Sequence, residues 1–284
     1  MAVRAGAESD LDAMVTLAVT QQAVGAHHIG YLGLEVDSIR KDIVGVDGWI
    51  DRTAVVIDDD QQLAGWLWGE KDDDMDRVWW WGPFLTEQAW QQQPDALYRL
   101  ASELVGGAEE EIAPDDRNVN VAELAERNGF RGEVASAVLS YTEAGFGRPT
   151  GVVAMEQEHR ADVAVLHDRL FLGTHTPGAT LVQSEDVRLV IVVAGEIVGY
   201  AAAEVQSDGS GYIDYLGVDP SHRRTGLGRR LVMGATDRLL GLGATSVNLT
   251  VREDNAAART LYESLGFTQE RLIRPFRKGF SLDS

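Results

Sequence analysis

Cysteine is absent from this chain of 284 residues. Its absence excludes disulfides, thiolate metal sites and a cysteine nucleophile. No window approaches the roughly 18 uninterrupted apolar residues that a membrane span needs, and the first residues, "MAVRAGAESDLDAMV", lack the apolar run of a signal peptide. We therefore expect a cytoplasmic protein without membrane association, present as a monomer or homodimer.

Positive charge is scarce and unevenly placed. The formal net charge is −20, and residues 1–147 carry 28 acids against 10 bases, whereas residues 148–284 carry 17 against 15. Such an excess of acids disfavours nucleic acid as a partner, because phosphate contacts dominate that affinity. It would favour a cationic small molecule by electrostatic steering, although solubility alone explains it equally well.

The two halves resemble each other. "RTAVVIDDDQQLAGWLWGE" (52–70) is similar to "VRLVIVVAGEIVGYAAAEV" (187–205), and "LAERNGF" (124–130) is similar to "LYESLGF" (261–267). Their glycines are offset by 134 residues in the first pair and by 137 in the second. Two features at nearly one offset predict a duplicated domain. The Gly- and Pro-rich stretch "EAGFGRPTG" (143–151) places the boundary between domains 1–147 and 148–284.

Alternating strand and helix patterns fill the second half. We expect strands at 152–155, 187–194, 197–205, 211–218, 245–251 and 267–276, and helices at 158–172, 226–241 and 254–266.

One stretch, "SHRRTGLGRR" (221–230), concentrates four arginines and two glycines between a strand and a helix. Backbone N–H groups at a helix N-terminus bind anions, and glycines let a phosphate approach. A P-loop would need a lysine that is not there, and Leu231 occupies the third glycine position of a dinucleotide loop. The pattern that fits is R-x-x-G-x-G, formed by Arg223, Gly226 and Gly228.

Together, "LGVDPSHRRTGLGRRL" and the later "LYESLGF" resemble the GCN5-related N-acetyltransferase (GNAT) superfamily over about residues 150–280. The resemblance implies an α/β fold of two tandem domains, each a twisted, mostly antiparallel sheet flanked by helices. It implies acetyl-coenzyme A as cosubstrate and no metal. The residues implied to contact the coenzyme are Leu216, Gly217, Val218, Arg223, Arg224, Thr225, Gly226, Leu227, Gly228, Arg229 and Asn255.

The same resemblance implies two catalytic roles. The N–H of Leu216 would donate to the thioester oxygen, and Tyr262 would protonate the leaving thiolate. A core aromatic beside Leu261 is the other interpretation of Tyr262.

Transfer to an amine also needs a group that accepts a proton. Asp214 and Glu204 interrupt apolar strands, where a charge is costly without a purpose. Strand alternation would place Asp214 on the face of Leu216. Either carboxylate could be the base, could bind the substrate cation, or could simply face solvent.

The first half departs from the pattern. "VWWWGPFLTEQAWQQQ" (78–93) stands where the loop should be, and Ala125 stands where Tyr262 does, while Asn118 matches Asn255. We expect this domain to be degenerate. All seven tryptophans lie between Trp49 and Trp90; they could form a wall for a cation or pack in the core. His27 and His28 lack ligands at metal spacing and are assigned no metal role.

The sequence thus predicts an N-acetyltransferase that moves an acetyl group directly from acetyl-coenzyme A to a primary amine of a small molecule, with a cationic molecule as one candidate. The tandem layout also resembles that of mycothiol synthases, which acetylate a cysteinyl amine on a sugar–inositol conjugate. A coenzyme-A-binding sensor without catalysis is the alternative from another class.

Overall fold

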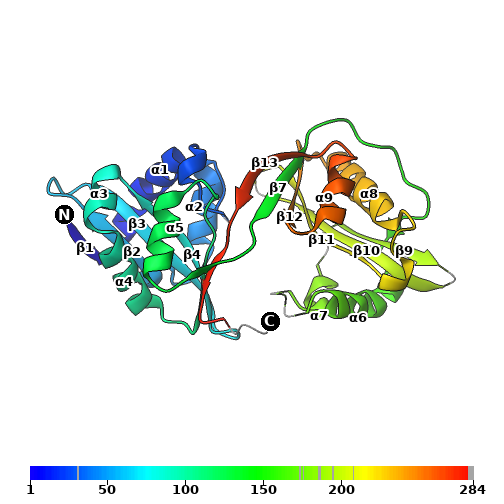
Figure 1. The fold of residues 1–284 in the computed structure, drawn as a ribbon, viewed down its shortest axis with the longest axis horizontal. Helices are drawn as coiled ribbons and strands as arrows, with labels where there is room; N and C mark the ends of the chain where they lie inside the picture. The colour runs from blue at the N-terminus through cyan, green and yellow to red at the C-terminus, as the bar shows by residue number, and fades with distance from the viewer. Residues whose placement is uncertain are drawn as a thin grey trace. The chain divides into compact units, whose positions relative to one another are not determined.

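The computed structural model describes residues 1–280 except 31, 173, 175, 185–186, 194 and 207. Its contacts divide the chain into two compact units, which we call unit 1 (Met1–Ser136 with Arg271–Ser284) and unit 2 (Ala137–Glu270). Each unit contains one seven-stranded sheet with helices against it (Figure 1). No helix in the described part of the chain is long and apolar enough to cross a membrane.

The sheet of unit 1 has the strand order β1-β2-β3-β4-β5-β14-β6. Strands β1 to β4 are antiparallel, and β4 and β5 are parallel. The strands are β1 (Ala2–Ala5), β2 (Thr53–Ile57), β3 (Leu63–Asp72), β4 (Arg77–Leu85), β5 (Glu109–Ile112), β14 (Phe276–Lys278) and β6 (Arg131–Gly132).

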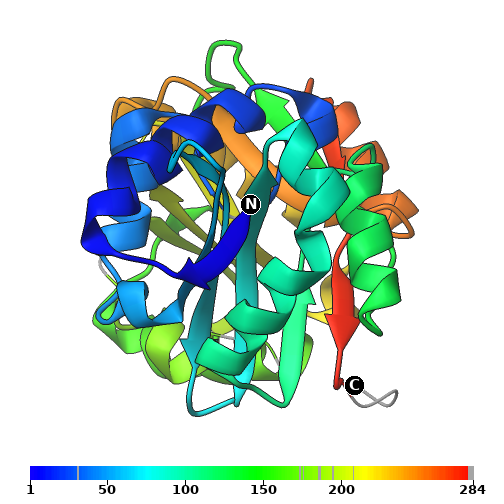
Figure 2. The same cartoon turned by 90° about the vertical axis from the view of Figure 1, so that its left-hand side faces the viewer.

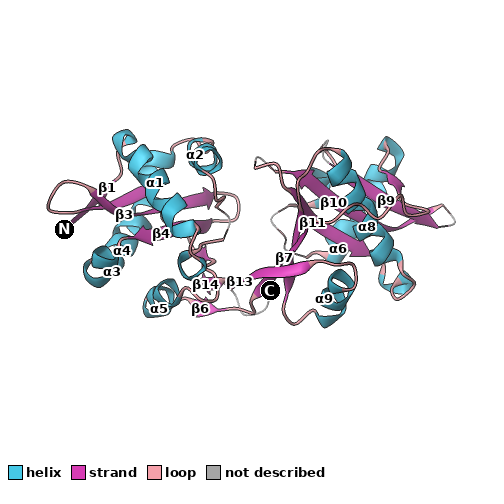
Figure 3. Cartoon of the chain, turned by 90° about the horizontal axis from the view of Figure 1, so that it is seen from above, coloured by secondary structure: helices cyan, strands magenta, loops and turns pink. Residues whose placement is uncertain are grey.

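Helices cover both faces of this sheet. Figure 3 shows α1 (Leu11–Gln22) and α2 (Val36–Val44) on one side, and α3 (Glu87–Gln92), α4 (Pro94–Val105) and α5 (Val119–Arg127) on the other. In Figure 2, where unit 1 faces the viewer, the sheet runs between these two groups. The apolar faces bury three tryptophans completely, namely Trp66, Trp68 and Trp80. These three belong to the core and not to a ligand wall.

The sheet of unit 2 has the order β13-β7-β12-β11-β10-β9-β8. Strands β8 to β11 are antiparallel, and β11 and β12 are parallel. The strands are β13 (Thr268–Ile273), β7 (Ser136–Tyr141), β12 (Val247–Arg252), β11 (Gly211–Val218), β10 (Glu196–Val205), β9 (Val187–Val193) and β8 (Val153–Ala154). The last residue of the strand expected at 187–194 lies outside the described residues.

Two pairs of helices flank this sheet. Helices α6 (Arg160–Leu170) and α7 (Gly178–Leu181) lie on one face, and α8 (Leu227–Gly241) and α9 (Ala256–Glu263) lie on the other (Figure 1). The predicted fold class is confirmed, because both units are α/β with mixed, largely antiparallel sheets in the same order of elements.

The halves exchange one strand. In unit 2, β7 from the first half lies between β12 and β13, and in unit 1, β14 from the second half lies between β5 and β6. The single strand expected at 267–276 is therefore wrong: β13 ends at Ile273, and after Pro275 the chain continues as β14 in the other sheet. The domain boundary between residues 147 and 148 was inferred from the sequence repeat and remains a prediction. The two units that the contacts define divide the chain at other residues.

Candidate functional site

The arginine–glycine loop connects β11 to α8 in unit 2. Gly226 caps the helix in the left-handed region with φ +84°, and within the described residues no side chain caps the first N–H groups. A Cβ at Gly226 would meet no atom within 4 Å, and a Cβ at Gly228 would meet only Leu261 Cδ2 at 3.5 Å and Leu216 Cδ2 at 3.9 Å. The free N–H donors therefore face open space, which the glycines keep open.

None of the four arginines of this loop pairs with a carboxylate among the described residues. Three of them bond neutral oxygens, and Arg224 bonds none in that part of the chain. The bonded pairs are Arg223 Nε with Val218 O at 3.2 Å, Arg229 with Ser264 Oγ at 2.9 Å and Arg230 with Thr150 O at 2.9 Å. Four uncompensated guanidinium groups beside a helix N-terminus favour a polyanion.

The acid closest in sequence to the loop, Asp219, pairs with none of these arginines among the described residues. It accepts hydrogen bonds from the hydroxyl and the backbone N–H of Ser221 and pairs with Arg169. These interactions, with the Ser221 hydroxyl first, lower the pKa of Asp219 to about 2. Asp219 stays ionised at neutral pH, but its charge is directed to Arg169.

Next to the loop, β11 has an open edge. Its parallel ladder with β12 ends at the pair Ile213 and Leu249, while its ladder with β10 continues to Val218. Asp219 N–H donates to Val198 O at 2.9 Å. In an antiparallel ladder every second residue bonds the same neighbouring strand, so the N–H and C=O groups of Leu216 and Val218 point away from β10. They therefore face the side from which β12 has departed.

Asp214 is the additional residue of a β-bulge, at the register shift between Ala202 and Ala203. The bulge interrupts strand alternation, so the argument that placed Asp214 on the face of Leu216 is wrong. Asp214 is exposed. Burial is the main cause that raises the pKa of Tyr200, and the charge of Asp214 adds to it.

Tyr262 is a buried residue of α9, 8% exposed, whose ring centroid lies 6.0 Å from that of Phe267. Burial raises the pKa of its hydroxyl to about 12. The hydroxyl has no hydrogen-bond partner among the residues that the structure describes. Because both Leu261 and Leu216 approach Gly228, α9, β11 and the start of α8 converge at one place.

Two other predicted residues lie elsewhere or serve another purpose. Asn255 caps α9, with its Oδ1 accepting from Ala258 N–H at 3.1 Å. Glu204 is in register with Tyr212, three residues along β10 from the partner of Leu216, or roughly 10 Å. It lines an open groove of about 530 Å³ together with Arg160, Arg188 and Arg238. The structure therefore does not bring Glu204 to Leu216.

Unit 1 differs from unit 2 at the corresponding places, although an open pocket of about 430 Å³ adjoins the start of α3. The hydroxyl of Thr86 caps α3 by accepting from Ala89 N–H at 3.4 Å. Only about 10 Å³ remains between β4, β5 and α5, in a cavity lined by Trp80, Tyr98 and Phe130 among others. Ala125 also lines this cavity, whereas its counterpart in unit 2 is Tyr262.

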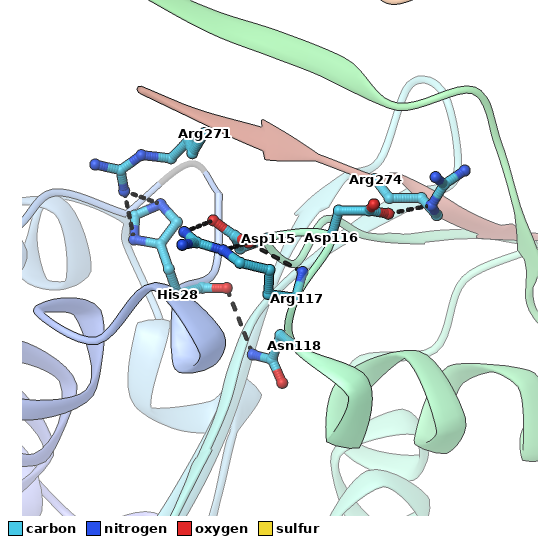
Figure 4. A network of polar contacts seen from close by, with 7 residues as sticks. All are labelled: His28, Asp115, Asp116, Arg117, Asn118, Arg271 and Arg274. Carbon is cyan, nitrogen blue, oxygen red and sulfur yellow. Dashed lines mark hydrogen bonds and ion pairs between the residues drawn. The ribbon is translucent and has the colours of Figure 1, made fainter. Parts of the chain in front are cut away.

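Sequence reasoning missed a polar network in unit 1 (Figure 4). Arg271 lies 2.8 Å from both ring nitrogens of His28, and Arg117 donates twice to Asp115 at 2.8 Å. Burial would raise the pKa of Asp115, but the hydrogen bonds from Arg117 outweigh it and lower that pKa. Arg271 is more than 240 positions from His28 in the chain, so no local pattern could reveal the contact.

A second missed cluster lies in unit 2. His167 of α6 is fully buried, and its ring lies 4.7 Å from that of Tyr215 and 5.8 Å from that of Tyr200. A lone histidine on the apolar face of a helix was the signal available in the sequence. Within the described residues, no group of three or more His, Asp or Glu side chains could hold a metal ion.

Residues 153–267, which include the loop, the open edge and Tyr262, match the family model of the acetyltransferase (GNAT) family. These are 115 of the chain's 284 residues, and over them the chain is similar to the GNAT superfamily. Its fold is similar over 98% of its length to 95% of a GCN5-related N-acetyltransferase from Sphaerobacter thermophilus, with a TM-score of 0.80 and 18% identity. It is also similar over 99% of its length to all of a tandem GNAT protein from the clavulanic acid biosynthesis pathway, with a TM-score of 0.66 and 14% identity.

Curated relatives match this chain over short segments. Mycothiol acetyltransferase of Thermobispora bispora is 44% identical over 82 residues, which are 27% of this chain and 28% of that protein. The [ribosomal protein bS18]-alanine N-acetyltransferase of Escherichia coli is 38% identical over 82 residues, which are 29% of this chain and 55% of that protein. The match thus spans about a quarter of the first relative and about half of the second.

Proposed function

We propose that unit 2 is an N-acetyltransferase that moves an acetyl group from acetyl-coenzyme A directly to a primary amine of a small molecule. The observation that carries this proposal is the loop at residues 221–230, whose four arginines have no carboxylate partner in the described part of the chain and surround a helix start that no side chain caps. This loop thus stays positive and open in a protein of net charge −20.

The residues present fit the coenzyme. Backbone N–H groups from Arg224 to Arg229 would hold the pyrophosphate at the start of α8, because donors and dipole both point there. The backbone of Val218 would meet the pantetheine arm along the open edge of β11, whereas the N–H and C=O groups of Gly217 face Tyr200 of β10. Asn255 would add its side-chain N–H groups, since its Oδ1 already caps α9.

When bound, acetyl-coenzyme A would supply the thioester carbonyl carbon that the amine attacks. Leu216 N–H would donate to the carbonyl oxygen and stabilise the charge that develops there. A C–N bond forms, a C–S bond breaks, and Asp214 would take the proton that the amine loses. Tyr262 would donate its hydroxyl proton to the departing sulfur, since burial keeps that proton in place and also raises the pKa of a thiol beside it.

Unit 1 has a supporting role in this proposal. Side chains fill the space beside β4 and β5, which we call the wedge, and the hydroxyl of Thr86 caps the N-terminus of α3. A coenzyme arm would have no room between these strands, and the carboxylates of Asp58 and Glu87 line the open pocket at the start of α3 and disfavour a pyrophosphate there. We therefore assign one coenzyme to each chain.

A cysteinyl amine on a sugar conjugate is the second candidate acceptor. The local 44% identity to a mycothiol acetyltransferase favours it. A protein N-terminus is a third candidate acceptor, because the chain is locally 38% identical to a ribosomal-protein alanine acetyltransferase.

The test measures thiol release from acetyl-coenzyme A with a panel of amines: polyamines, aminoglycosides, a cysteinyl glucosamine–inositol and an alanine-ended peptide. The chain has no cysteine, so every thiol detected comes from the coenzyme or from a thiol-bearing acceptor, for which mass spectrometry of the product replaces the colour reaction. Acceptor-dependent release is expected. Tight binding of coenzyme A without acetylation of any amine overturns the proposal and leaves a sensor.

A further inference from the structure

Asp219 directly follows β11 and begins the connection to α8. Its carboxylate is shared between two elements: Oδ1 accepts from the backbone N–H of Ser221 at 2.9 Å and from the Ser221 hydroxyl, and Oδ2 accepts from the guanidinium of Arg169. Arg169 belongs to the last turn of α6, 50 positions earlier in the chain. One carboxylate thus connects the arginine–glycine loop with a helix on the opposite face of the sheet from α8 (Figure 1).

The last turn of α6 packs against β11 close to this carboxylate. A Cβ at Gly217 would lie 2.6 Å from Tyr200 Cε1 and 2.9 Å from Leu170 Cδ1, so both side chains touch the strand at this glycine. Gly217 is two residues before Asp219, and Leu170 is the residue after Arg169. The guanidinium of Arg169 therefore extends from a packed helix end, and it holds Asp219 at a defined position.

The loop that follows Asp219 has an unfavourable backbone conformation. Arg224 has φ +66°, a left-handed conformation in which the Cβ of an ordinary residue is crowded. The four like charges of the loop also repel one another. Against these costs, Asp219 holds the first turn through Ser221, and Thr225 Oγ1 donates to His222 O at 2.6 Å. Contacts within the protein thus hold the loop in its open conformation.

We propose that Asp219 and Arg169 are positioning residues for the pyrophosphate of the coenzyme: Asp219 holds the first turn of the loop, and Arg169 holds Asp219 from α6. The assignment rests on the proposed function, because it takes the start of α8 as the pyrophosphate site. Donors that are already in place bind more tightly, because less conformational freedom is lost on binding. Both residues act without touching the coenzyme, since their charges are paired with each other.

Asp219→Asn distinguishes positioning from simple electrostatics, because the two predict opposite results. The amide keeps an oxygen for the Ser221 N–H but loses the charge that pairs with Arg169. Electrostatics alone would tighten the binding of a polyanion, since a negative charge beside its site is removed. Positioning predicts instead that the Kd for coenzyme A rises about two- to fivefold, the range expected for a partly exposed ion pair. Calorimetry of the full chain with coenzyme A measures the change.

Variants of Arg169 complete this test. Arg169→Met should weaken binding to a similar extent, Arg169→Lys should retain part of the affinity, and Arg169→Met combined with Asp219→Asn should cost no more than either change alone. Arg160→Met is the matched control, because it removes an equal charge at the first residue of the same helix. Among the described residues Arg160 bonds the neutral Gln183 side chain, at 3.3 Å, so this variant should leave the Kd unchanged.

Steady-state kinetics separate positioning from general damage. In Asp219→Asn and Arg169→Met the KM for acetyl-coenzyme A should rise, while kcat and the acceptor KM stay unchanged. Equal or tighter binding of coenzyme A by Asp219→Asn, or additive losses in the double variant, overturns the assignment while the affinity of the wild type stands. A wild type that binds coenzyme A but acetylates no amine overturns the proposed function alone, and a wild type that binds no coenzyme A overturns both.

Discussion

Lys278 of β14 lies 2.8 Å from Glu110 of β5, and its ammonium group also donates to Tyr98 at 2.8 Å. Glu110 is 5% exposed and further accepts from Tyr98 and from Trp80 Nε1. Next to it, Arg277 pairs with the buried Glu111 at 2.6 Å. The strand that unit 1 receives from the far end of the chain thus brings the cations that neutralise two buried acids of β5.

Lys278→Met should destabilise unit 1 by about 2 kcal/mol, because it leaves Glu110 buried without its cation. All seven tryptophans belong to unit 1, so fluorescence during urea unfolding reports this unit alone. Lys41→Met, at an exposed position of α2, is the matched control. The double variant Lys278→Met with Glu110→Gln should recover part of the loss; equal unfolding midpoints for wild type and Lys278→Met would show that the pair contributes nothing.

Stability of unit 1 should fall as the pH drops below about 6.5. Burial, followed by the charge of Arg271, lowers the pKa of His28 from 6.5 to about 4. Between these values the unfolded chain binds a proton that the folded chain does not, so the free energy of unfolding decreases by about 2 kcal/mol at pH 5. His28→Gln should remove this part of the decrease between pH 7 and pH 5, and His27→Gln, its exposed neighbour, should not. An identical decrease in His28→Gln and wild type would refute the assignment.

Gly226→Trp should abolish binding of coenzyme A, because an indole would fill the space in front of the first N–H groups of α8. Gly243→Trp is the control: this glycine follows the same helix, also has positive φ at +96°, and a Cβ there would also meet no atom within 4 Å. Both variants bear the same backbone strain, about 1 kcal/mol. Calorimetry with coenzyme A should show binding only for Gly243→Trp; retained affinity in Gly226→Trp would place the site elsewhere.

Tyr262→Phe should lower kcat by about 100-fold, as expected for loss of a general acid, with little change in affinity for coenzyme A. Because the pKa of Tyr262 is raised to about 12, its hydroxyl keeps the proton up to about pH 10. The pH–rate profile should therefore show no alkaline decline from this residue in that range. If Tyr262→Phe retains the wild-type kcat, Tyr262 is a core aromatic residue and not the general acid.

Substitutions of the two candidate bases, Asp214 and Glu204, should have different effects on kcat. Asp214→Asn should lower kcat, because Asp214 is the exposed residue of the bulge that precedes the open edge of β11. Glu204→Gln should leave kcat unchanged, since Glu204 lines the groove at the other end of β10. Steady-state rates across pH 5–9 with the best amine of the panel measure both. The reverse result would transfer the base role to Glu204.

Much of unit 2 was predictable because its signals are local. The loop 221–230, the strand before it and the helix after it follow from glycine, arginine and apolar spacing within about 30 neighbouring residues. Errors arose where a contact depends on a partner far away. The bulge at Asp214 is defined only against β10, and the groove around Glu204 is assembled from β9, β10, α6 and α8.

The sequence by itself determined the repeat, the fold class and the place of the arginine–glycine loop, because periodicity, turn residues and charge act on neighbouring residues. Only the tertiary structure decided that β7 and β14 change places, that unit 1 has its wedge filled, and that Asp219 connects the loop to Arg169 of α6. These depend on which strands pair and which buried polar groups find partners. Such choices are made by the free energy of the whole assembled sheet and not by any short stretch of it.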